Sequence, residues 1–581
     1  MPAASPSGSG PGAWFGVMTS LAGALAAWHS AVWLSGLLTG APARPNLGDT
    51  MEAFMRSPAN PASGYAGAQV APAALIWALF VAELTAVAAV AVGWKTRRSR
   101  RQRDGLAGHR QWAPFLGKRA ARRSAAQTRP GLSDRRNAPM EEVAVPLARS
   151  VGDGRRLYVR HEDSIAVMAP PRAFKTAGVL ADLVRTAPGP CVAGSSKGDL
   201  LSITYLSRKA RGTVYVFDPG DVIGWPTPLR WSPVRGCEQP RVAISTAEAF
   251  AAATPDDTHT TNSKFFIKQA RDVLRCLLHA AALDGRDMGS VVEWALRMDS
   301  PSLPAREILR SHLDAAPGWA TALEEATSGD RGNGPLESTK KTLADMLSMF
   351  ADPAVLQACR PSEQEAFDIS RFLESTDTVY VMSGDNDTVA PLVTAFVNEI
   401  LRQARAAAER RWPARLDPPL RCVIDEVGNV APLPRLGSLM SRLGGQGTTL
   451  AIGGQGLGQA RDRWGEAGAA EVFGSATAKI VMGGTSEPDL LSMMSSLAGV
   501  MEVPVNSTTV ARGEVSTTAS DRERPILHPH QIRELSPSQG LLIYRQAPPV
   551  VVEFQPYWEG PWAKEAAQSA EAVARLTGRL A

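Results

Sequence analysis

The 581-residue chain contains few cysteines, and no two of them are close enough to form a metal or redox motif. Its five cysteines, Cys191, Cys237, Cys276, Cys359 and Cys422, lie at least 39 residues apart. This spacing excludes CxxC motifs and zinc-ligand patterns, so we interpret the cysteines as reduced core residues. No internal repeat is visible. Hydrophobic residues make up 44% and charged residues 20%, which excludes a disordered or fibrous chain and allows two to four domains.

The chain also lacks a broad excess of positive charge, although its formal net charge is +5. Residues 95–136 hold 14 Lys or Arg and two Asp, whereas residues 1–94 carry two Arg and three acidic residues. The remaining sequence is therefore net acidic. This distribution argues against a broadly basic body that binds nucleic acid.

Long hydrophobic runs, by contrast, occur twice near the N-terminus. Residues 14–38 contain only His29 as an ionisable group, and residues 71–94 contain only Glu83. Each run is long enough to cross about 30 Å of hydrocarbon, so we predict a transmembrane hairpin. A secretory signal is the alternative for the first run, but that run has no positive leader and is too long.

The basic segment sets the predicted orientation of this hairpin. The loop at 39–70 carries two Arg and two acidic residues, whereas the second run is followed by KTRRSRRQR. The positive-inside rule then puts both termini in the cytoplasm of a multi-pass protein of the inner or plasma membrane. The basic segment is interpreted as a headgroup anchor, with DNA guidance as the alternative. Glu83 is costly inside a membrane, so we expect it to face another helix or subunit, or to lie nearer the interface.

A strand–turn–helix pattern at 164–186 suggests a phosphate-binding loop. The apolar segment 164–168 leads into Ala169-Pro170-Pro171-Arg172-Ala173-Phe174-Lys175-Thr176, and a helical pattern follows. In such a loop Lys175 reaches the terminal phosphates of ATP and Thr176 binds Mg²⁺. Ala169 and Phe174 replace the two glycines of the GxxxxGK[ST] pattern, so an ordinary turn with a surface lysine is the alternative.

A second apolar strand pattern ends in two carboxylates. Residues 421–424 precede Asp425 and Glu426, the arrangement in which Asp425 holds Mg²⁺ and Glu426 polarises the attacking water. A strand at 449–452 leads to Gln455, which can sense the terminal phosphate. Further strands are predicted at 191–193, 214–217, 378–382, 478–482 and 540–544. Strands alternating with helices predict an α/β fold with a parallel sheet core, whose carboxyl ends gather these residues.

Several segments together resemble the TraG/TraD coupling proteins of conjugative type IV secretion. They are PPRAFKT (170–176), SSKGDL (195–200), VYVFDP (214–219), the segment 424–460 with Asn429, and 478–499. The tract 229–240 resembles the actinobacterial branch of this family. The resemblance implies a hexameric, membrane-anchored RecA-like P-loop ATPase that receives relaxase-bound DNA and passes it to a secretion channel.

The resemblance also implies a division of the chain and roles for its residues. We predict a transmembrane hairpin over 1–94, a basic cytoplasmic linker over 95–150, a RecA-like domain over 151–236 and 376–556, an inserted all-α domain over 237–375 and a tail helix over 557–581. Residues 420–545 correspond to the TraM-recognition region. Pro170, Pro171, Arg172, Ala173, Phe174, Lys175 and Thr176 form the nucleotide loop, and Glu426 and Gln455 are catalytic. Residues 501–525 are expected to form a flexible surface loop.

The leading hypothesis is a DNA-translocating ATPase in which an arginine acts in trans, with Arg172 and Arg545 as candidates. The first alternative is a pseudo-ATPase docking scaffold that recruits secretion cargo, because Phe174 departs from the loop pattern. The second is a segregation pump of the FtsK type, for which the short C-terminal tail leaves no DNA-reading module.

Overall fold

A computed structural model describes residues 11–40, 45–57, 60–65, 70–99, 105–255, 262–328, 334–384, 388–511 and 514–580. Contacts divide the chain into two compact units, Met1–Arg103 and Asp104–Ala581. Each unit is described by itself below.

The N-terminal unit is helical and has a small aromatic core. It contains α1 (Pro11–Thr39), α2 (Leu47–Arg56), the 3-10 turn η1 (Pro61–Gly64) and α3 (Ala73–Ser99). Trp28 of α1 is fully buried and meets the rings of Trp77 and Phe80 of α3 edge-on, at centroid distances of 4.6 and 5.2 Å. These contacts pack α1 against α3, and the connection between the two helices contains α2 and η1.

Both predicted spans therefore coincide with helices, but their membrane insertion stays a prediction. Among the described residues, no helix combines the length and the hydropathy needed to cross a membrane. Glu83 accepts a hydrogen bond from the hydroxyl of Ser30 on α1 at 3.0 Å, so its carboxylate faces the neighbouring helix. Residues 100–104 of the basic segment lie outside the described residues.

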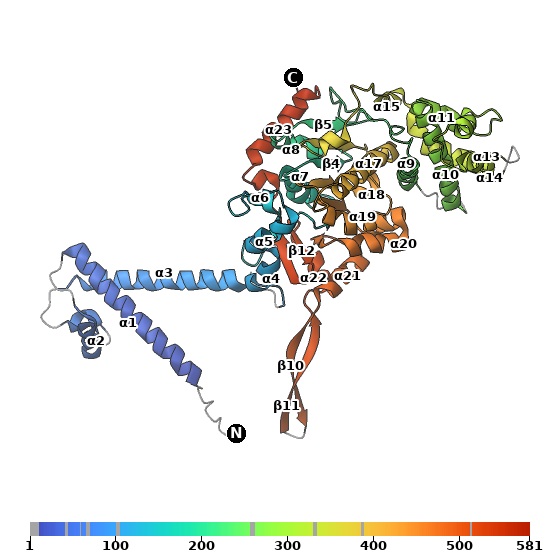
Figure 1. Cartoon of the computed structure of the whole chain (residues 1–581). Helices are drawn as coiled ribbons and strands as arrows, with labels where there is room; N and C mark the ends of the chain where they lie inside the picture. The colour runs from blue at the N-terminus through green and yellow to red at the C-terminus, as the bar shows by residue number, and fades with distance from the viewer. Residues whose placement is uncertain are drawn as a thin grey trace. The chain divides into compact units, whose positions relative to one another are not determined.

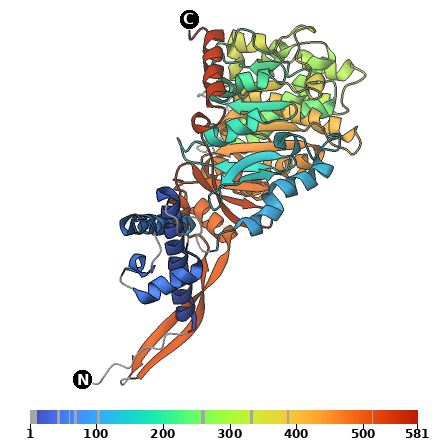
Figure 2. The ribbon, with the colours of Figure 1, turned by 90° about the vertical axis from the view of Figure 1, so that its left-hand side faces the viewer.

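The larger unit is built on a mixed sheet of eleven strands (Figures 1 and 2). The strand order is β2–β1–β13–β12–β9–β3–β8–β7–β4–β6–β5. The strands are β1 (Val145–Ser150), β2 (Arg156–Val159), β3 (Ile165–Met168), β4 (Cys191–Ser195), β5 (Val214–Phe217), β6 (Thr378–Met382), β7 (Leu420–Ile424), β8 (Thr448–Gly454), β9 (Ala478–Met482), β12 (Gln539–Tyr544) and β13 (Ala547–Glu553). The run from β9 to β5 is parallel, which confirms the predicted parallel core, and four antiparallel strands extend it on the β9 side.

Alternating side chains of the sheet bury into two separate layers of helices. On one face, residues such as Cys422 and Ile424 pack with α9 (Pro240–Ala253), α17 (Ala390–Glu409) and α19 (Leu436–Arg442). On the other face, Val423 packs with η2 (Lys175–Leu180), α7 (Ala181–Arg185), α8 (Asp199–Lys209) and α23 (Ala563–Leu576). Because both faces are covered, most side chains of the parallel strands are apolar, and exceptions such as Arg421 lie near the amino ends of the strands.

The stretch between β5 and β6 is helical. It contains α9, α10 (Ser263–Leu283), α11 (Met288–Leu296), α12 (Pro304–Ser311), α13 (Trp319–Thr327), α14 (Pro335–Met346), η3 (Ser348–Ala351), α15 (Pro353–Ala358) and α16 (Ile369–Phe372). In the described part of 237–375, the sole β pairing is a single bridge from Ala366 to Arg230. Helix α10 is the hub of this stretch, since it packs against α9, α11, α12, α13 and α14.

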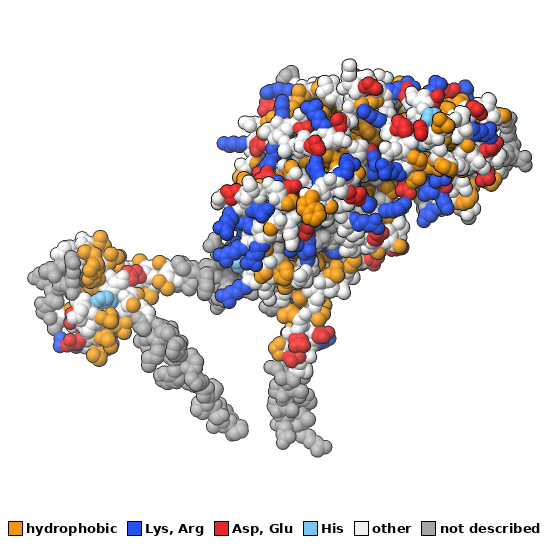
Figure 3. All heavy atoms as spheres, viewed as in Figure 1, with side chains coloured by type: hydrophobic (Ala, Val, Ile, Leu, Met, Phe, Trp, Pro, Cys, Tyr) orange, Lys and Arg blue, Asp and Glu red, His pale blue; other side chains and the backbone are white. Residues whose placement is uncertain are grey.

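The segment before the sheet is also ordered. Residues within the predicted linker form α4 (His109–Leu116), α5 (Lys118–Thr128), α6 (Met140–Val143) and β1. Trp112 and Leu116 are buried in the core on the α7–α8 face of the sheet. Figure 3 shows Lys and Arg side chains gathered over α4 and α5, whereas acidic and basic side chains are interspersed elsewhere on this face of the larger unit.

The prediction of a flexible loop at 501–525 was wrong. The segment forms an antiparallel ribbon, β10 (Val500–Ala511) with β11 (Glu514–Pro525), which extends away from the large sheet (Figure 1). The Ser/Thr content suggested a loop, but the abundant Val and Thr are β-branched and favour extended strands.

The remaining helices between β7 and the C-terminus are α18 (Val427–Val430), η4 (Leu443–Gln446), α20 (Leu457–Ser475), α21 (Pro488–Ala498), α22 (Pro529–Arg533) and η5 (Tyr557–Glu559).

Candidate nucleotide site

Three neighbouring parallel strands bring the predicted site residues to one edge of the sheet. Strand β8 lies between β3 and β7, with Met168 paired to Gly454 and Ile424 paired to Ile452. The nucleotide loop follows β3, Asp425 and Glu426 follow β7, and Gln455 follows β8. The carboxyl ends of adjacent parallel strands are where ligands bind in such sheets.

Four side chains from two of these segments contact one another directly. Lys175 Nζ lies 2.9 Å from Asp425 Oδ1 and also pairs with Glu426 Oε1. The hydroxyl of Thr176 donates a hydrogen bond to Asp425 Oδ2. The side chains of Lys175 and Asp425 are 8% and 9% exposed, and Glu426 is 20% exposed. The cluster is thus largely removed from water, where charge–charge interactions are less screened than at the surface.

The backbone of the loop takes the conformation that glycine normally provides. Phe174 has φ = 57° and Arg172 has φ = 65°, so both lie in the left-handed region. For a residue with a side chain this conformation costs roughly 1–2 kcal/mol. Phe174 therefore reproduces the backbone geometry of the missing glycine, and its ring packs edge-on against Trp558 at a centroid distance of 5.4 Å.

The end of β8 is shaped by a glycine that the sequence pattern did not single out. A Cβ on Gly453 would lie 2.9 Å from Asp425 Oδ1 and 3.1 Å from Lys175 Cδ, which is too close for unshifted atoms. The only available signal was the Gly453–Gly454 pair at the strand end. Gln455 follows this pair and is exposed at the same edge, and its role as a phosphate sensor stays a prediction.

A carboxylate missed in the sequence fixes the chain after Gln455. Glu487 accepts hydrogen bonds from the backbone N–H groups of Leu457 and Gly458, at 2.6 and 3.0 Å. These groups open helix α20, and a carboxylate there satisfies free donors and complements the helix dipole. Because Glu487 is distant from α20 in sequence, no local pattern could have revealed this cap.

The residues present fit a nucleotide with Mg²⁺. Thr176 and Asp425 supply a hydroxyl and a carboxylate oxygen side by side, which suits a cation that takes few protein ligands together with phosphates and water. Glu426 Oε2 is buried and has no hydrogen-bond partner within the described residues, so it is available to a water molecule. Within the described part of the chain, no group of three or more His, Cys, Asp or Glu side chains could hold a metal ion. Mg²⁺ at this site would therefore need phosphate or water ligands as well.

The two arginines predicted as candidates to act in trans lie at different places. Arg172 is exposed within the loop itself. Arg545 follows β12, whose Tyr544 pairs with Ala478 at the amino end of β9, so it lies at the opposite edge of the sheet. There Arg545 pairs with the buried Asp163. Burial opposes the charged guanidinium, but the Asp163 carboxylate outweighs it and raises the pKa of Arg545.

The same opposite edge contains a buried histidine. His161 Nδ1 accepts from Arg421 at 3.2 Å, and the other ring nitrogen, Nε2, donates to the carbonyl of Glu142 at 3.3 Å. Burial lowers the pKa of His161 well below its usual value, and the charge of Arg421 lowers it further. Burial also lowers the pKa of Arg421, to about 10. The imidazole is therefore neutral. Its contact with Arg421, at the start of β7, gives it a structural role.

Comparisons with known proteins agree with this arrangement. Residues 419–537 match the family described as "TraM recognition site of TraD and TraG", which confirms the predicted resemblance over this segment. A search of the curated proteins found no match to the sequence.

The fold is also that of a solved bacterial protein. The structure titled "Bacterial conjugative coupling protein TrwBdeltaN70" in its unbound form is 16% identical, with a TM-score of 0.52 over 71% of this chain and 88% of that chain. TrwB in complex with the GTP analogue GDPNP is 17% identical, with a TM-score of 0.50 over 68% of this chain and 86% of that chain. At these identities the likeness shows a shared fold, and the predicted actinobacterial branch stays a prediction.

Proposed function

We propose that this chain is a membrane-anchored coupling protein of a conjugative or type IV secretion system, which uses ATP to transfer DNA, or a DNA–protein complex, to the channel. The observation that carries the proposal is the convergence of Lys175, Thr176, Asp425 and Glu426 at the carboxyl ends of β3 and β7. The TraG/TraD recognition segment and the TrwB-like fold support the same conclusion.

In this proposal each residue of the cluster has a distinct chemical task. The ammonium group of Lys175 exchanges its carboxylate partners for the terminal phosphates of ATP, so that its charge is never left uncompensated. Released from Lys175, the Glu426 carboxylate accepts a hydrogen bond from the attacking water and orients it. Thr176 and Asp425 would hold Mg²⁺, and the ion would supply positive charge to neutralise the phosphates.

The proposal also covers the membrane anchor, the oligomeric state and the partners. The apolar helices α1 and α3 would anchor the protein in the cell membrane, with both termini in the cytoplasm and the basic segment at the headgroups. Six copies would form a ring with nucleotide at their interfaces, where Arg172 or Arg545 of a neighbour completes the site. Relaxase, other relaxosome proteins and the secretion channel would be its partners, and DNA would be held without base readout.

One observation favours a second candidate, a docking scaffold that does not hydrolyse ATP. Lys175 is already paired with two carboxylates, so its positive charge is balanced without a phosphate. A scaffold of this kind would still use the recognition segment at 419–537 to recruit cargo.

DNA-stimulated ATP hydrolysis by the full chain in lipid nanodiscs distinguishes the two candidates. The coupling-protein proposal predicts that DNA of unrelated sequences raises the hydrolysis rate of the wild-type protein, and that Glu426→Gln shows no hydrolysis with or without DNA. Equal rates for the wild type, Lys175→Ala and Glu426→Gln would exclude the motor and leave the scaffold.

A further inference from the structure

A hollow of about 430 Å³ opens beside the nucleotide loop. Its lining includes Phe174 of the loop, Arg149 of β1, Glu553 at the end of β13 and residues 554–556, which follow that strand. Its volume lies in the range of small-molecule sites, and Phe174 is adjacent in sequence to Lys175. The hollow therefore lies next to the loop that is proposed to hold the phosphates.

Two of the residues that line the hollow are aromatic, Phe174 and Phe554. The ring of Trp558 packs edge-on against the Phe174 ring at a centroid distance of 5.4 Å. Phe554 is 1% exposed and reaches the helix after the loop, because a Cβ on Gly178 would lie only 3.2 Å from Phe554 Cβ. The two rings are thus held by different elements, because Phe174 belongs to the loop and Phe554 follows strand β13.

The other residues that line the hollow are mostly polar and carry more negative than positive charge. Glu553, Gln555 and Glu559 provide carboxylate and amide groups, and Arg149 provides a guanidinium. Two carboxylates beside one cation repel a phosphate but accept hydrogen bonds from amino groups. An aromatic floor with such acceptors suits a planar, neutral ring that bears N–H donors, rather than a second anion.

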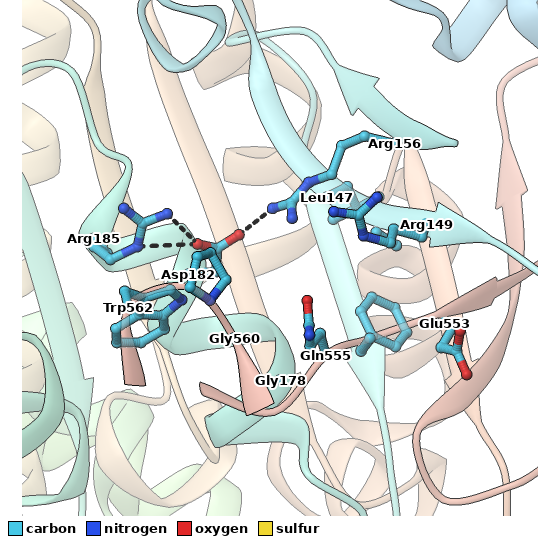
Figure 4. A pocket seen from close by; sticks show the side chains of 13 residues that line it. Leu147, Arg149, Arg156, Gly178, Asp182, Arg185, Glu553, Gln555, Gly560 and Trp562 are labelled. Atoms are coloured by element: carbon cyan, nitrogen blue, oxygen red, sulfur yellow. Dashed lines mark hydrogen bonds and ion pairs between the residues drawn. The ribbon is translucent and has the colours of Figure 1, made fainter. Parts of the chain in front are cut away.

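A neighbouring hollow is unsuitable for the same ligand (Figure 4). It shares Arg149, Glu553 and Gln555 with the first but has a volume of only about 50 Å³. At its far end Asp182 lies between two arginines, and it accepts a hydrogen bond from Arg185 Nη2 at 2.7 Å. These ion pairs close the smaller hollow, so the larger one beside Phe174 is the place with room for a ring.

We propose that the hollow beside Phe174 binds the purine base of the nucleotide whose phosphates contact Lys175, with Phe174 as an aromatic wall against the base. The inference rests on the proposed function, because it requires the loop to bind a nucleotide. It gives Phe174 a role of its own: the residue keeps the left-handed backbone of a glycine and adds a ring for base recognition.

Calorimetric titration of the full chain with MgATP and with Mg-tripolyphosphate separates base binding from phosphate binding. In Phe174→Gly, we expect affinity for ATP to fall about tenfold, since one aromatic–base contact typically accounts for that order of difference. Affinity for tripolyphosphate should stay unchanged, because glycine adopts the same left-handed backbone and only the ring is lost. Trp558→Ala should weaken ATP binding by roughly threefold without affecting tripolyphosphate, since it removes the support of the Phe174 ring.

Trp412→Ala is the matched control, because Trp412 is 96% exposed on the surface and should affect neither ligand. The inference is overturned if the wild type binds ATP no better than tripolyphosphate, or if both Phe174→Gly and Trp558→Ala retain full affinity for ATP. A wild-type protein that binds neither ligand would overturn the proposed function as well. The two failures are therefore distinguishable.

Discussion

The ion pair between Lys175 and Glu426 makes a quantitative prediction about the protein without nucleotide. Lys175 is the cation shared by two largely buried carboxylates, Asp425 and Glu426. Lys175→Ala leaves those two negative charges side by side, and removing one partner from a buried pair typically costs about 3–5 kcal/mol of unfolding free energy. Adding Glu426→Gln to Lys175→Ala removes one of the two negative charges, and with it their mutual repulsion. The double variant should therefore regain about 1–3 kcal/mol relative to the sum of the single changes.

The assay is a double-mutant cycle on the unfolding free energy, measured by urea denaturation at neutral pH. The exposed pair of Arg297 and Glu293 on α11 serves as control, since its side chains are 73% and 59% exposed and its coupling should stay below about 0.5 kcal/mol. Additive effects of Lys175→Ala and Glu426→Gln would refute the reasoning, because additivity would mean that the two side chains are not paired in solution.

Two further predictions concern the packing of the site and the buried histidine. Gly453→Ala should destabilise the protein by about 1–3 kcal/mol and weaken MgATP binding, because the added Cβ would press on Asp425. Calorimetry measures both the stability and the affinity. Gly474→Ala is the control and should change neither, because its Cβ would meet nothing within 4 Å. The pKa of His161 is lowered in the folded protein, so below about pH 6.5 the imidazole takes up a proton only in the unfolded chain. The free energy of unfolding should therefore fall by up to about 1.4 kcal/mol for each pH unit below that value. His161→Gln should flatten this acid limb of the urea-unfolding profile, and an unchanged slope would contradict it.

Local patterns were sufficient to predict the parallel core of the sheet. The apolar runs that end at Met168, Ile424 and Met482 are short, buried on both faces and followed by turn residues, which is the pattern of central parallel strands. Their carboxyl ends had to meet at one edge, so the proximity of Lys175 and Asp425 followed from topology.

Other features depend on contacts between distant segments, which a single sequence does not reveal. The strands β1 and β2 were missed because each is short and partly polar, and β13 was missed because Pro548 and Pro549 stand near its start and disfavour a strand. All three pair in antiparallel fashion at one side of the sheet. The left-handed conformation of Phe174 contradicts its residue type, and the contact with Trp558 lies nearly 400 residues away in sequence. The ribbon at 500–525 was mistaken for a loop because its polar composition outweighed its β-branched residues in the prediction.

In the proposed function, one cluster both binds and hydrolyses ATP, and the two tasks are divided between Lys175 and Glu426. A single measurement on the full chain tests this division: MgATP affinity and the hydrolysis rate, determined together for the wild type, Lys175→Ala and Glu426→Gln. We expect Glu426→Gln to bind MgATP at least as tightly as the wild type but not to hydrolyse it, whereas Lys175→Ala should lose binding. Hydrolysis by Glu426→Gln at the wild-type rate, or MgATP binding that does not depend on Lys175, would contradict it.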